Sequence, residues 1–407
     1  MTNCRSCETP IKAFMSFGQQ PLANALQQPG RQESVEKFYE LAPAVCPNCQ
    51  LFQLINQPPP KTMFTERYPF LTSSSRSMTK HFEEFALNLM TNLPEMENAS
   101  FVVEIGSNDG TLLQPFARSK IKHLGIEPSP NVADVAIKRN LNTKVAFFNS
   151  DTASEIYEQY GPADLIIAAN VIGHIPDIID LGRGVAKLLG PDGKFVFEAV
   201  YLSDVLRNVA FDQLYDEHVF TFSATSVLNV FKQHGLELVK LEHQNVHGGS
   251  MRFYLAHRGR HPVDHSVPLI LHAEEKQGLD SLETYYAFKL ATEKIRHQLT
   301  SKIIELNDHG ASVTGYGATA KSTTILNYCD LGPDHIEWIQ DSTKEKQGLL
   351  TPGSHIPIVS QEVFRHSNPD YAVLFAWNHR AEIEEKEKKW RASGGKWITY
   401  VPKVNIE

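Results

Sequence analysis

The segment from Phe211 to Phe220 concentrates side chains that can do chemistry. It reads F-D-Q-L-Y-D-E-H-V-F, so a tyrosine, two acids and a histidine fill positions 215 to 218. Aromatic neighbours shield carboxylates and imidazoles from water and shift their pKa values towards neutrality, as a general base requires. A surface turn with solvated charges is the alternative interpretation. We favour a catalytic segment, because it follows a predicted strand at the edge where ligands bind.

A second candidate site is the turn after the apolar residues Val102 to Ile105. It has the pattern E-x-G-x-x-x-G, formed by Glu104, Gly106 and Gly110, and an apolar helical pattern follows. Glycine lets a ligand approach the backbone closely at the turn, and the free N–H groups at the start of the following helix can bind phosphates or carboxylates. The spacing is not that of the dinucleotide fingerprint. It resembles the first loop of class I S-adenosylmethionine-dependent methyltransferases; the alternative is an ordinary turn in another α/β protein.

The following residues predict the elements that position this turn. Strands are expected at 122–127, 143–148, 163–170 and 194–200, with helical segments between them. This alternation predicts a doubly wound parallel sheet that binds ligands at the carboxyl ends of its strands. Glu127, at one such end, is placed to accept hydrogen bonds from ribose hydroxyls, and Asn149 is suited to an adenine edge. The predicted cofactor-binding residues are Glu104, Gly106, Asn108, Asp109, Gly110, Glu127, Phe148, Asn149, Ala169 and Asn170.

Strands at 235–242 and 250–257 complete the predicted sheet, and a long helix is expected from Ala287. A second α/β unit follows, whose turn G-Y-G-A-T-A does satisfy the dinucleotide spacing, with Asp341 about 20 residues further on. It predicts a nucleotide or pyrophosphate cradle, with Lys321 available to neutralise phosphate. The predicted substrate-binding residues are His247, Gly248, Gly249, Tyr316, Gly317, Ala318, Thr319, Lys321, Asp341, Asn378 and His379.

Two C-x-x-C pairs stand near the start of the chain: Cys4 with Cys7, and Cys46 with Cys49. In a reducing compartment this spacing favours one tetrahedral Zn²⁺ ion held by four thiolates. Such a site is structural, because no coordination position stays open for water or substrate. Disulfides or a redox pair are the alternatives. Cys329 is expected to be a buried apolar residue.

Composition excludes several classes of protein. The formal net charge is −8, which argues against nucleic acid as the main partner. No apolar run approaches 18 residues and the first 30 lack the pattern of a signal peptide, so we expect a cytoplasmic protein without membrane contact. Three prolines at 58–60 predict a domain boundary. The hydroxyl-rich segment 72–77 either caps the next helix or, with Tyr68, forms a lid over the cofactor.

The motifs occur in an order that resembles the nucleotide-sugar 3-C-methyltransferases over almost the entire chain. They are the two C-x-x-C pairs, E-I-G-S-N-D-G-T, N-V-I-G-H-I-P, F-D-Q-L-Y-D-E-H-V-F-T-F-S, H-G-G-S, G-Y-G-A-T-A-K-S and L-F-A-W-N-H. The resemblance implies a zinc domain at 1–60, an S-adenosylmethionine-binding domain at 61–260 and a Rossmann-like α/β domain at 261–407 that helps to hold the nucleotide sugar. It also implies a monomer that acts on a dTDP-linked 4-keto-6-deoxyhexose.

The same resemblance implies roles for single residues. His218 would remove the proton at C3 of the sugar, and the resulting enolate would attack the methyl group of S-adenosylmethionine. Tyr215, Glu217 and His174 would flank the keto sugar, and Tyr68 would lie near the methyl donor. Chemistry agrees with this assignment, because a carbon nucleophile next to a ketone requires a base of near-neutral pKa, and imidazole meets that need.

Two alternatives stay open at this point. The first is a bifunctional methyltransferase–reductase with NAD(P) at the C-terminal glycine turn, which the turn and Asp341 support and the lack of a Tyr-x-x-x-Lys motif opposes. The second is a non-catalytic zinc-ribbon scaffold, which the intact Glu104, Gly106, Gly110 and Glu127 oppose.

Overall fold

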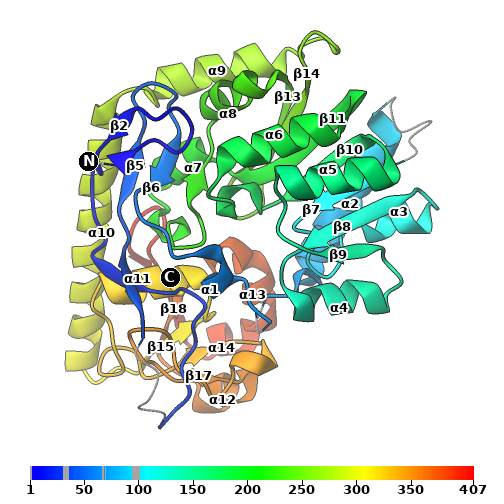
Figure 1. Cartoon of the computed structure of the whole chain (residues 1–407). Helices are drawn as coiled ribbons and strands as arrows, with labels where there is room; N and C mark the ends of the chain where they lie inside the picture. The colour runs from blue at the N-terminus through cyan, green and yellow to red at the C-terminus, as the bar shows by residue number, and fades with distance from the viewer. Residues whose placement is uncertain (1, 31–35, 67, 69, 94–100) are drawn as a thin grey trace.

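Two sheets built mainly of parallel strands form the body of the protein, and a cysteine-rich module lies beside them (Figure 1). The computed structural model describes residues 2–30, 36–66, 68, 70–93 and 101–407. The cysteine-rich module and the C-terminal sheet lie to one side of the central sheet in the view of Figure 1, with the helix α10 (Leu282–Asp308) along the outer edge.

The central sheet has the strand order β13-β14-β11-β10-β7-β8-β9. The five strands from β11 to β9 run parallel, whereas β14 is antiparallel to both β11 and β13. The predicted doubly wound parallel sheet is confirmed, with an antiparallel hairpin at one side. The strands are β7 (Val102–Ile105), β8 (His123–Glu127), β9 (Thr143–Val145), β10 (Ala163–Ala169), β11 (Leu189–Val200), β13 (Leu236–Gln244) and β14 (Ser250–His257).

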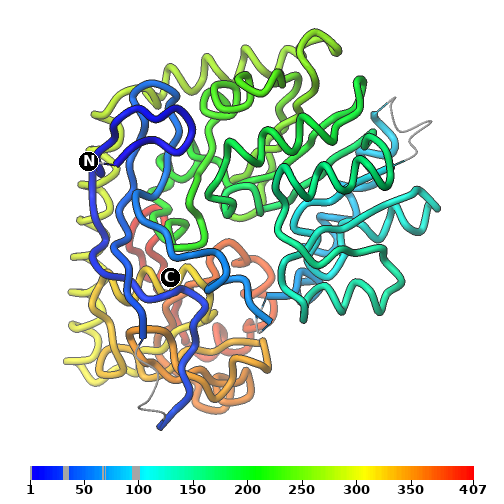
Figure 2. The backbone as a smooth tube through the Cα atoms, viewed as in Figure 1, coloured from blue at the N-terminus to red at the C-terminus, as the bar shows by residue number. Residues whose placement is uncertain are grey.

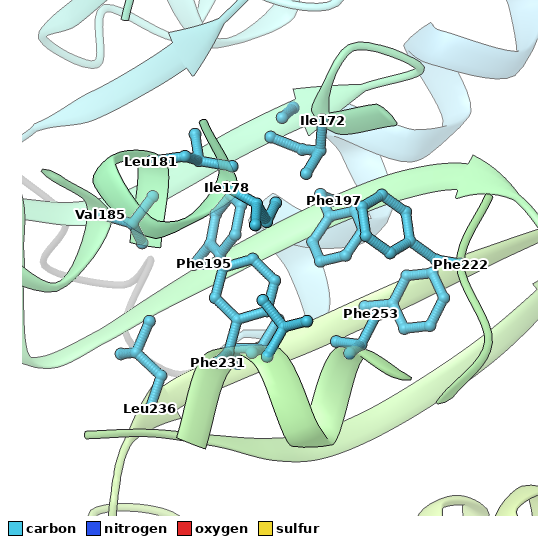
Figure 3. Packing of buried hydrophobic residues seen from close by; sticks show 14 of the residues in the cluster. Ile172, Ile178, Leu181, Val185, Phe195, Phe197, Phe222, Phe231, Leu236 and Phe253 are labelled. Carbon is cyan, nitrogen blue, oxygen red and sulfur yellow. The ribbon is translucent and has the colours of Figure 1, made fainter. Parts of the chain in front are cut away.

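Helices bury both faces of this sheet. On one face α6 (Ile178–Leu188) and α8 (Ala224–Phe231) pack against phenylalanines of β11 and β14 (Figure 3). The rings of Phe197 and Phe253 stack there with centroids 4.7 Å apart. On the other face α2 (Arg76–Asn92) packs through Phe82, Phe85 and Leu89. Also in this part of the chain are α3 (Gln114–Arg118), α4 (Pro130–Lys138), α5 (Ser150–Tyr160), α7 (Leu202–Arg207) and α9 (Ser266–Gln277).

Two predicted strand boundaries are wrong. The strand expected at 143–148 ends at Val145, because Phe148 turns into the core and the side chain of Asn149 caps α5 by accepting the Thr152 N–H at 2.7 Å. The strand expected at 194–200 begins earlier, at Leu189, which pairs with Ala163. The cap expected from the hydroxyl-rich segment is present: Ser75 Oγ accepts the Met78 N–H at the start of α2.

The C-terminal sheet has the order β17-β16-β15-β18-β19-β20, parallel except for β20. Its strands are β15 (Val313–Tyr316), β16 (Ile339–Gln340), β17 (Ile358–Val359), β18 (Tyr371–Leu374), β19 (Lys396–Thr399) and β20 (Asn405–Ile406). The helices are α11 (Ala320–Tyr328), α12 (Gln361–Ser367), α13 (Arg380–Lys386) and α14 (Lys388–Ala392). The helix expected from Ala287 begins at Leu282.

The cysteine-rich module is a set of short antiparallel strands that shares a sheet with the central part of the chain. Strand β6 (Phe52–Leu54) pairs with β5 (Pro43–Val45) on one side and with β12 (Phe220–Thr221) on the other. The other strands are β1 (Thr2–Asn3), β2 (Pro10–Ile11), β3 (Gln19–Pro21) and β4 (Phe38–Glu40), and the helix α1 (Pro60–Met63) follows.

From this module the N-terminal chain runs down over the C-terminal part (Figure 2). Gln27 pairs with Leu350, and His355 Nε2 lies 2.6 Å from Glu36 Oε2. The N-terminal segment therefore bridges regions more than 300 positions apart in the sequence. In the described part of the chain, every helix is too short or too polar to cross a lipid bilayer.

Candidate active site and zinc centre

The four cysteines of the two C-x-x-C pairs converge at one point. Their sulfur atoms all lie within 4.8 Å of one another, with 3.5 Å between Cys4 and Cys49 and between Cys7 and Cys46. Four thiolates at the usual Zn–S distance sit about 3.8 Å apart in a tetrahedron, so the cluster fits zinc. The predicted ligand set Cys4, Cys7, Cys46 and Cys49 thus forms one cluster, with three of the cysteines buried and Cys7 half-buried.

The two pairs form the same turn. The N–H of Glu8 donates to Cys4 O, and the N–H of Gln50 donates to Cys46 O, with Glu8 and Gln50 both at positive φ. Buried Gln53 donates from Nε2 to Cys4 Sγ at 3.2 Å, and its Oε1 accepts the Arg5 N–H. Gln53 also pairs in the sheet with Phe220, two residues after His218. The cysteine cluster therefore supports the strand that follows the candidate catalytic loop.

The predicted cofactor edge lies at the carboxyl ends of β7 and β8. Both carboxylate oxygens of Glu127 accept backbone N–H groups, from Ser129 at 2.8 Å and from Asn108 at 3.0 Å. These two bonds fix the carboxylate, and each oxygen keeps a lone pair for a ribose hydroxyl. Burial raises the pKa of Glu127. Gly106, at φ +67°, lies so close to Val171 that a Cβ would come within 2.5 Å of that side chain.

The segment at 70–73 lies directly over this turn. Asn108 donates to Phe70 O and accepts the Thr72 N–H at 2.9 Å, and Asp109 accepts the Ser73 N–H at 3.0 Å. Asp109 is fully buried and also accepts the hydroxyl of Thr111. The hydroxyl-rich segment thus both caps α2 and covers the predicted cofactor turn, so the two interpretations of it are compatible.

Glu104 is buried under the same turn. Its Oε2 atom makes no hydrogen bond among the described residues, and burial, together with the carboxylates of Asp109 and Glu127, raises its pKa well above the usual range. At the end of β10, Asn170 adopts φ +55°, and its Oδ1 is also buried and makes no hydrogen bond within the described part of the chain. Ala169 lies beside it, whereas Phe148 belongs to the core and Asn149 caps α5.

The loop at 211–220 leaves two of its side chains partly exposed. Within these ten residues only Tyr215 and His218 are partly exposed, and the others are buried. The Tyr215 hydroxyl lies 2.6 Å from His218 Nε2, and His218 Nδ1 lies 2.7 Å from the Gln213 carbonyl oxygen. Burial lowers the pKa of His218 to about 4, so the ring is neutral at neutral pH.

His174, in a 3₁₀ turn after β10, is brought next to this pair. Its ring centroid is 5.0 Å from that of His218, and its other face stacks on Phe64 at 5.9 Å. Burial lowers the pKa of His174 well below its ordinary value. The predicted residues His174, Tyr215 and His218 therefore meet, although 41 or more positions separate His174 from the others.

Glu217 is held in place by Tyr68 and Asn24. The Tyr68 hydroxyl donates to Oε2 at 3.2 Å and Asn24 Nδ2 donates to Oε1 at 2.6 Å. Tyr68 also accepts the Asn131 amide through its carbonyl oxygen, close to the end of β8. Tyr68 thus lies between the predicted cofactor edge and the catalytic loop. Burial raises the pKa values of both Tyr68 and Glu217.

The C-terminal part packs against the loop at 211–220. Asp212 Oδ2 accepts the Trp377 indole N–H at 2.6 Å and the Tyr400 hydroxyl at 2.9 Å, while its buried Oδ1 has no partner among the described residues. Lys321 donates to Asn378 Oδ1 and lies 4.8 Å from the centre of the Trp377 ring. Burial lowers the pKa of Lys321. His379 follows Asn378 in the same turn.

The two glycines after β13, Gly248 and Gly249, each lie very close to a neighbouring side chain. A Cβ on Gly248 would come within 2.2 Å of Trp377, and one on Gly249 within 2.1 Å of Asp204, at φ values of +86° and +124°. His247 takes φ +55°, its Nε2 lies 3.4 Å from the Asn170 amide, and its carbonyl accepts Gln213 Nε2 at 2.6 Å. His247 thus links the ends of β10 and of the catalytic loop.

The C-terminal glycine turn is occupied by the protein itself. Lys346 Nζ donates to Ala318 O at 2.8 Å and lies 3.7 Å from Asp341 Oδ2. Thr319 caps α11, and Gly317 at φ +92° approaches Ala376. The Tyr316 side chain leaves the turn, because its hydroxyl donates to Glu387 inside an aromatic core. Of the predicted substrate-binding side chains, Tyr316 is thus buried in the core of the C-terminal part.

Several residues that contact the loop at 211–220 were not among the functional residues predicted from the sequence. Asn24 lies 193 positions from Glu217, and Asp212, Trp377 and Tyr400 come from three segments. Asp212 could have been found as an acid inside an aromatic-rich motif, and Trp377 as the tryptophan of the motif L-F-A-W-N-H. Nothing local marks Asn24, because its role depends on the path of the N-terminal segment across the loop.

Comparisons with known proteins agree with this layout. Residues 4–64 match the family described as a zinc binding domain, residues 78–241 a methyltransferase domain and residues 245–402 the C-methyltransferase C-terminal domain. The C-methyltransferase NovU of Streptomyces niveus is 34% identical over 405 residues, which cover 99% of this chain and 96% of that protein.

Solved structures match less than half of the chain and at lower similarity. A methyltransferase from Clostridium acetobutylicum has a TM-score of 0.36 and 14% identity, covering 44% of this chain and 92% of its own. Magnesium protoporphyrin IX methyltransferase of Synechocystis, with bound S-adenosylhomocysteine, has a TM-score of 0.35 and 11% identity, covering 44% and 82%. The assignment rests on the full-length relative and the three matched families. The chain belongs to the S-adenosylmethionine-dependent C-methyltransferases and carries a structural zinc centre.

Proposed function

We propose that this enzyme transfers a methyl group from S-adenosylmethionine to C3 of a dTDP-linked 4-keto-6-deoxyhexose. The observation that carries the proposal is the pair Tyr215 and His218, the two partly exposed side chains of a loop that otherwise is buried. This pair lies beside His174 at the end of β10, next to the predicted cofactor edge. In this proposal Tyr215, His218 and His174 supply the proton-accepting groups beside the methyl donor.

The chemistry of carbon methylation requires such groups. A carbon next to a ketone becomes nucleophilic only when a base removes its proton and leaves an enolate. Burial lowers the pKa of His218 to about 4 instead of holding it near neutrality as the sequence suggested, so the ring is neutral and keeps a lone pair that can receive a proton. S-adenosylmethionine supplies the activated methyl group, and the enolate supplies the electron pair, so the reaction itself requires no redox cofactor.

We assign the binding of the nucleotide diphosphate to the C-terminal part of the chain, at Lys321 and Trp377. The buried cation Lys321 and the Trp377 ring beside it offer a charge partner for phosphate and a flat surface for a base or sugar. In this proposal residues 1–60 form a structural zinc domain, 61–260 hold the cofactor and the catalytic loop, and 261–407 contribute to nucleotide-sugar binding. The enzyme acts as a cytoplasmic monomer.

The bifunctional alternative has a structural obstacle. A dinucleotide at the C-terminal turn would have to displace Lys346 from Ala318 and from Asp341, the acid that would otherwise bind the ribose. Titration with NADH or NADPH tests this alternative, and saturable binding at micromolar concentrations supports it. We set the non-catalytic scaffold aside, because the chain belongs to an enzyme family.

The experiment that tests the proposal uses a methyl-labelled donor. The purified enzyme is incubated with labelled S-adenosylmethionine and a panel of dTDP- and GDP-linked 4-ketosugars, and products are analysed by mass spectrometry and NMR. We expect a gain of one methyl group at C3 of a dTDP-linked 4-keto-6-deoxyhexose. Methylation at another atom, or only of GDP-linked sugars, contradicts the proposal.

A further inference from the structure

We infer that Arg139 is a positioning residue for the methyl donor, because it fastens residues 70–75 over the predicted cofactor turn. These six residues are called the cover below. The inference deepens the proposed function and rests on it, since it takes the cofactor to bind at the carboxyl ends of β7 and β8. Arg139 then acts through the cover and touches none of the reacting atoms.

Hydrogen bonds, and not apolar packing, hold the cover in place. Of its six residues only Thr72 is buried, and Phe70 is 49% exposed. Asn108 donates to the Phe70 carbonyl oxygen and accepts the Thr72 N–H. Asp109 accepts the Ser73 N–H at 3.0 Å. A segment with few buried apolar contacts opens at low free-energy cost, so each bond that closes the cover has a large share in keeping it closed.

Arg139 joins the cover to the turn with one side chain. Its Nη2 donates to Ser73 Oγ at 3.0 Å, and its Nη1 donates to Asp109 O at 3.0 Å. Nη1 also lies 3.7 Å from Asp109 Oδ2, the oxygen that accepts the Ser73 N–H. The planar guanidinium serves both acceptors at once, which a lysine ammonium cannot do in the same geometry.

The base from which Arg139 reaches the cover is rigid. Arg139 is the C-cap residue of α4, whose Val132 and Ala136 are fully buried. The end of this helix also packs closely on the turn, because a Cβ on Gly110 would come within 2.1 Å of Leu141. The turn and the end of α4 thus form one unit, and the cover is the part that can move relative to it.

The covered turn contains polar atoms that the protein leaves for a ligand. Glu104 Oε2 and Ser107 Oγ are buried and make no hydrogen bond within the described ranges of the chain. Buried polar atoms normally have partners, so a ligand that carries hydrogen-bond donors fits here. S-adenosylmethionine carries such donors in its ammonium group and its ribose hydroxyls. A closed cover retains this ligand, and the ligand leaves when the cover opens.

Direct binding measurements test the inference. Calorimetry gives the affinity for S-adenosylhomocysteine, and a chase of labelled S-adenosylmethionine with excess unlabelled cofactor gives the dissociation rate. We expect Arg139→Ala to weaken the affinity and speed dissociation by about 10- to 100-fold, as for lost hydrogen bonds to a charged group. Arg139→Lys should lie between this variant and wild type. Single-turnover methyl transfer at saturating cofactor should stay within about three-fold of wild type, because the chemical step is untouched.

A double-mutant cycle with Ser73 shows whether Arg139 acts through the cover. Ser73→Ala removes the hydroxyl that Arg139 binds and keeps the N–H that Asp109 accepts. It should weaken binding less than Arg139→Ala does, and the double variant should bind no more weakly than Arg139→Ala. Additive losses of affinity overturn the inference. An unchanged affinity in Arg139→Ala, or slower methyl transfer at unchanged affinity, overturns it as well.

Arg118→Ala is the matched control. Arg118 also joins α2 to a neighbouring helix, through Glu83 and Gln114, but its described hydrogen bonds do not reach the cover. This variant should bind the cofactor as wild type does. Should Arg139→Ala fail to fold in urea titrations, Ser73→Ala still decides, because an unchanged affinity and dissociation rate in that variant overturn the inference. The binding measurements need no sugar, so failure to methylate any ketosugar contradicts the proposed function alone.

Discussion

Asn24 donates a 2.6 Å hydrogen bond from Nδ2 to Glu217 Oε1, across 193 positions of sequence. The neighbouring Ala23 N–H donates to Asp216 Oδ1 at 2.9 Å, and the Ala23 carbonyl accepts the Thr323 hydroxyl of α11. The N-terminal segment is therefore a strap between the catalytic loop and the C-terminal part.

Asn24→Ala is expected to slow methyl transfer about ten-fold or more. The variant leaves the buried Glu217 carboxylate without this hydrogen-bond donor, at a free-energy cost of about 1–3 kcal/mol. Asn24→Asp places a second carboxylate beside Glu217, so its activity should fall below that of Asn24→Ala at pH 8 and recover as the pH is lowered. Steady-state rates at pH 6 to 8 measure both effects. Asn56→Ala, an exposed amide near Glu40, is the control. Equal rates for wild type and Asn24→Ala would show that Glu217 does not depend on the strap.

Gly106→Ala should destabilise the fold and weaken binding of S-adenosylmethionine. Alanine at positive φ costs about 1–2 kcal/mol, and the new Cβ also lies 2.5 Å from Val171. Gly235→Ala is the matched control, because Gly235 has φ +75° and open space around it. Urea unfolding should show a larger loss for Gly106→Ala, and Val171→Ala in that background should recover part of it. If Gly106→Ala lowers the free energy of unfolding no more than Gly235→Ala does, the contact with Val171 does not contribute to the loss.

Glu127→Gln is expected to weaken binding of S-adenosylmethionine by about 10- to 100-fold, since charged hydrogen bonds contribute about 1.5–3 kcal/mol. The reason is geometric as well as electrostatic: backbone N–H groups of Asn108 and Ser129 face both oxygens, and an amide NH₂ would oppose one of them. Calorimetric titration measures the affinity. Glu155→Gln changes only an exposed pair with Lys144 and should bind as wild type does. An unchanged affinity in Glu127→Gln would place the ribose elsewhere.

Gln53→Glu should lower the affinity for zinc by about 10- to 100-fold, the usual effect of losing a partner of a metal ligand. Glutamate keeps the acceptor for the Arg5 N–H but replaces the donor to Cys4 Sγ with an anion. Competition with a chromophoric chelator measures the affinity. Gln233→Ala, which loses a bond to the Ser6 hydroxyl and touches no sulfur in the described hydrogen bonds, is the control. Because Gln53 pairs with Phe220, zinc removal should also reduce activity.

The pH dependence of stability should report on Asp216. Burial, with the charge of Glu217, raises the pKa of Asp216 to about 7, whereas an unfolded aspartate titrates near 3.9. The folded protein therefore binds the extra proton between about pH 4 and pH 7, and stability falls as the pH rises through that window. Asp216→Asn keeps the acceptor for Ala23 and should flatten this fall by at least about 1 kcal/mol. Urea unfolding at pH 5 and pH 8 measures it, with exposed Asp192→Asn as control. Parallel curves for wild type and Asp216→Asn would contradict the assignment.

The sequence alone determined the local features of this protein. Strand, turn and helix follow one another at Glu104, Gly106 and Gly110 because apolar β-branched residues and glycine act within a few positions. The spacing of Cys4, Cys7, Cys46 and Cys49 predicted one cluster, since each C-x-x-C pair forms a turn of fixed geometry. The strand boundaries at 143–148 and 194–200 were wrong, because packing of Phe148 and pairing of Leu189 with Ala163 decide where these strands stop.

The assembly of the candidate active site depends on contacts between distant segments. The contact of Asn24 with Glu217, the two partners of Asp212 and the lysine across the C-terminal glycine turn join segments far apart in the sequence. Which ring nitrogen of His218 holds the proton depends on the Gln213 carbonyl, whose direction follows from packing of the whole loop. Local patterns can name residues able to do chemistry, but distances and hydrogen-bond directions arise only when distant elements pack against one another.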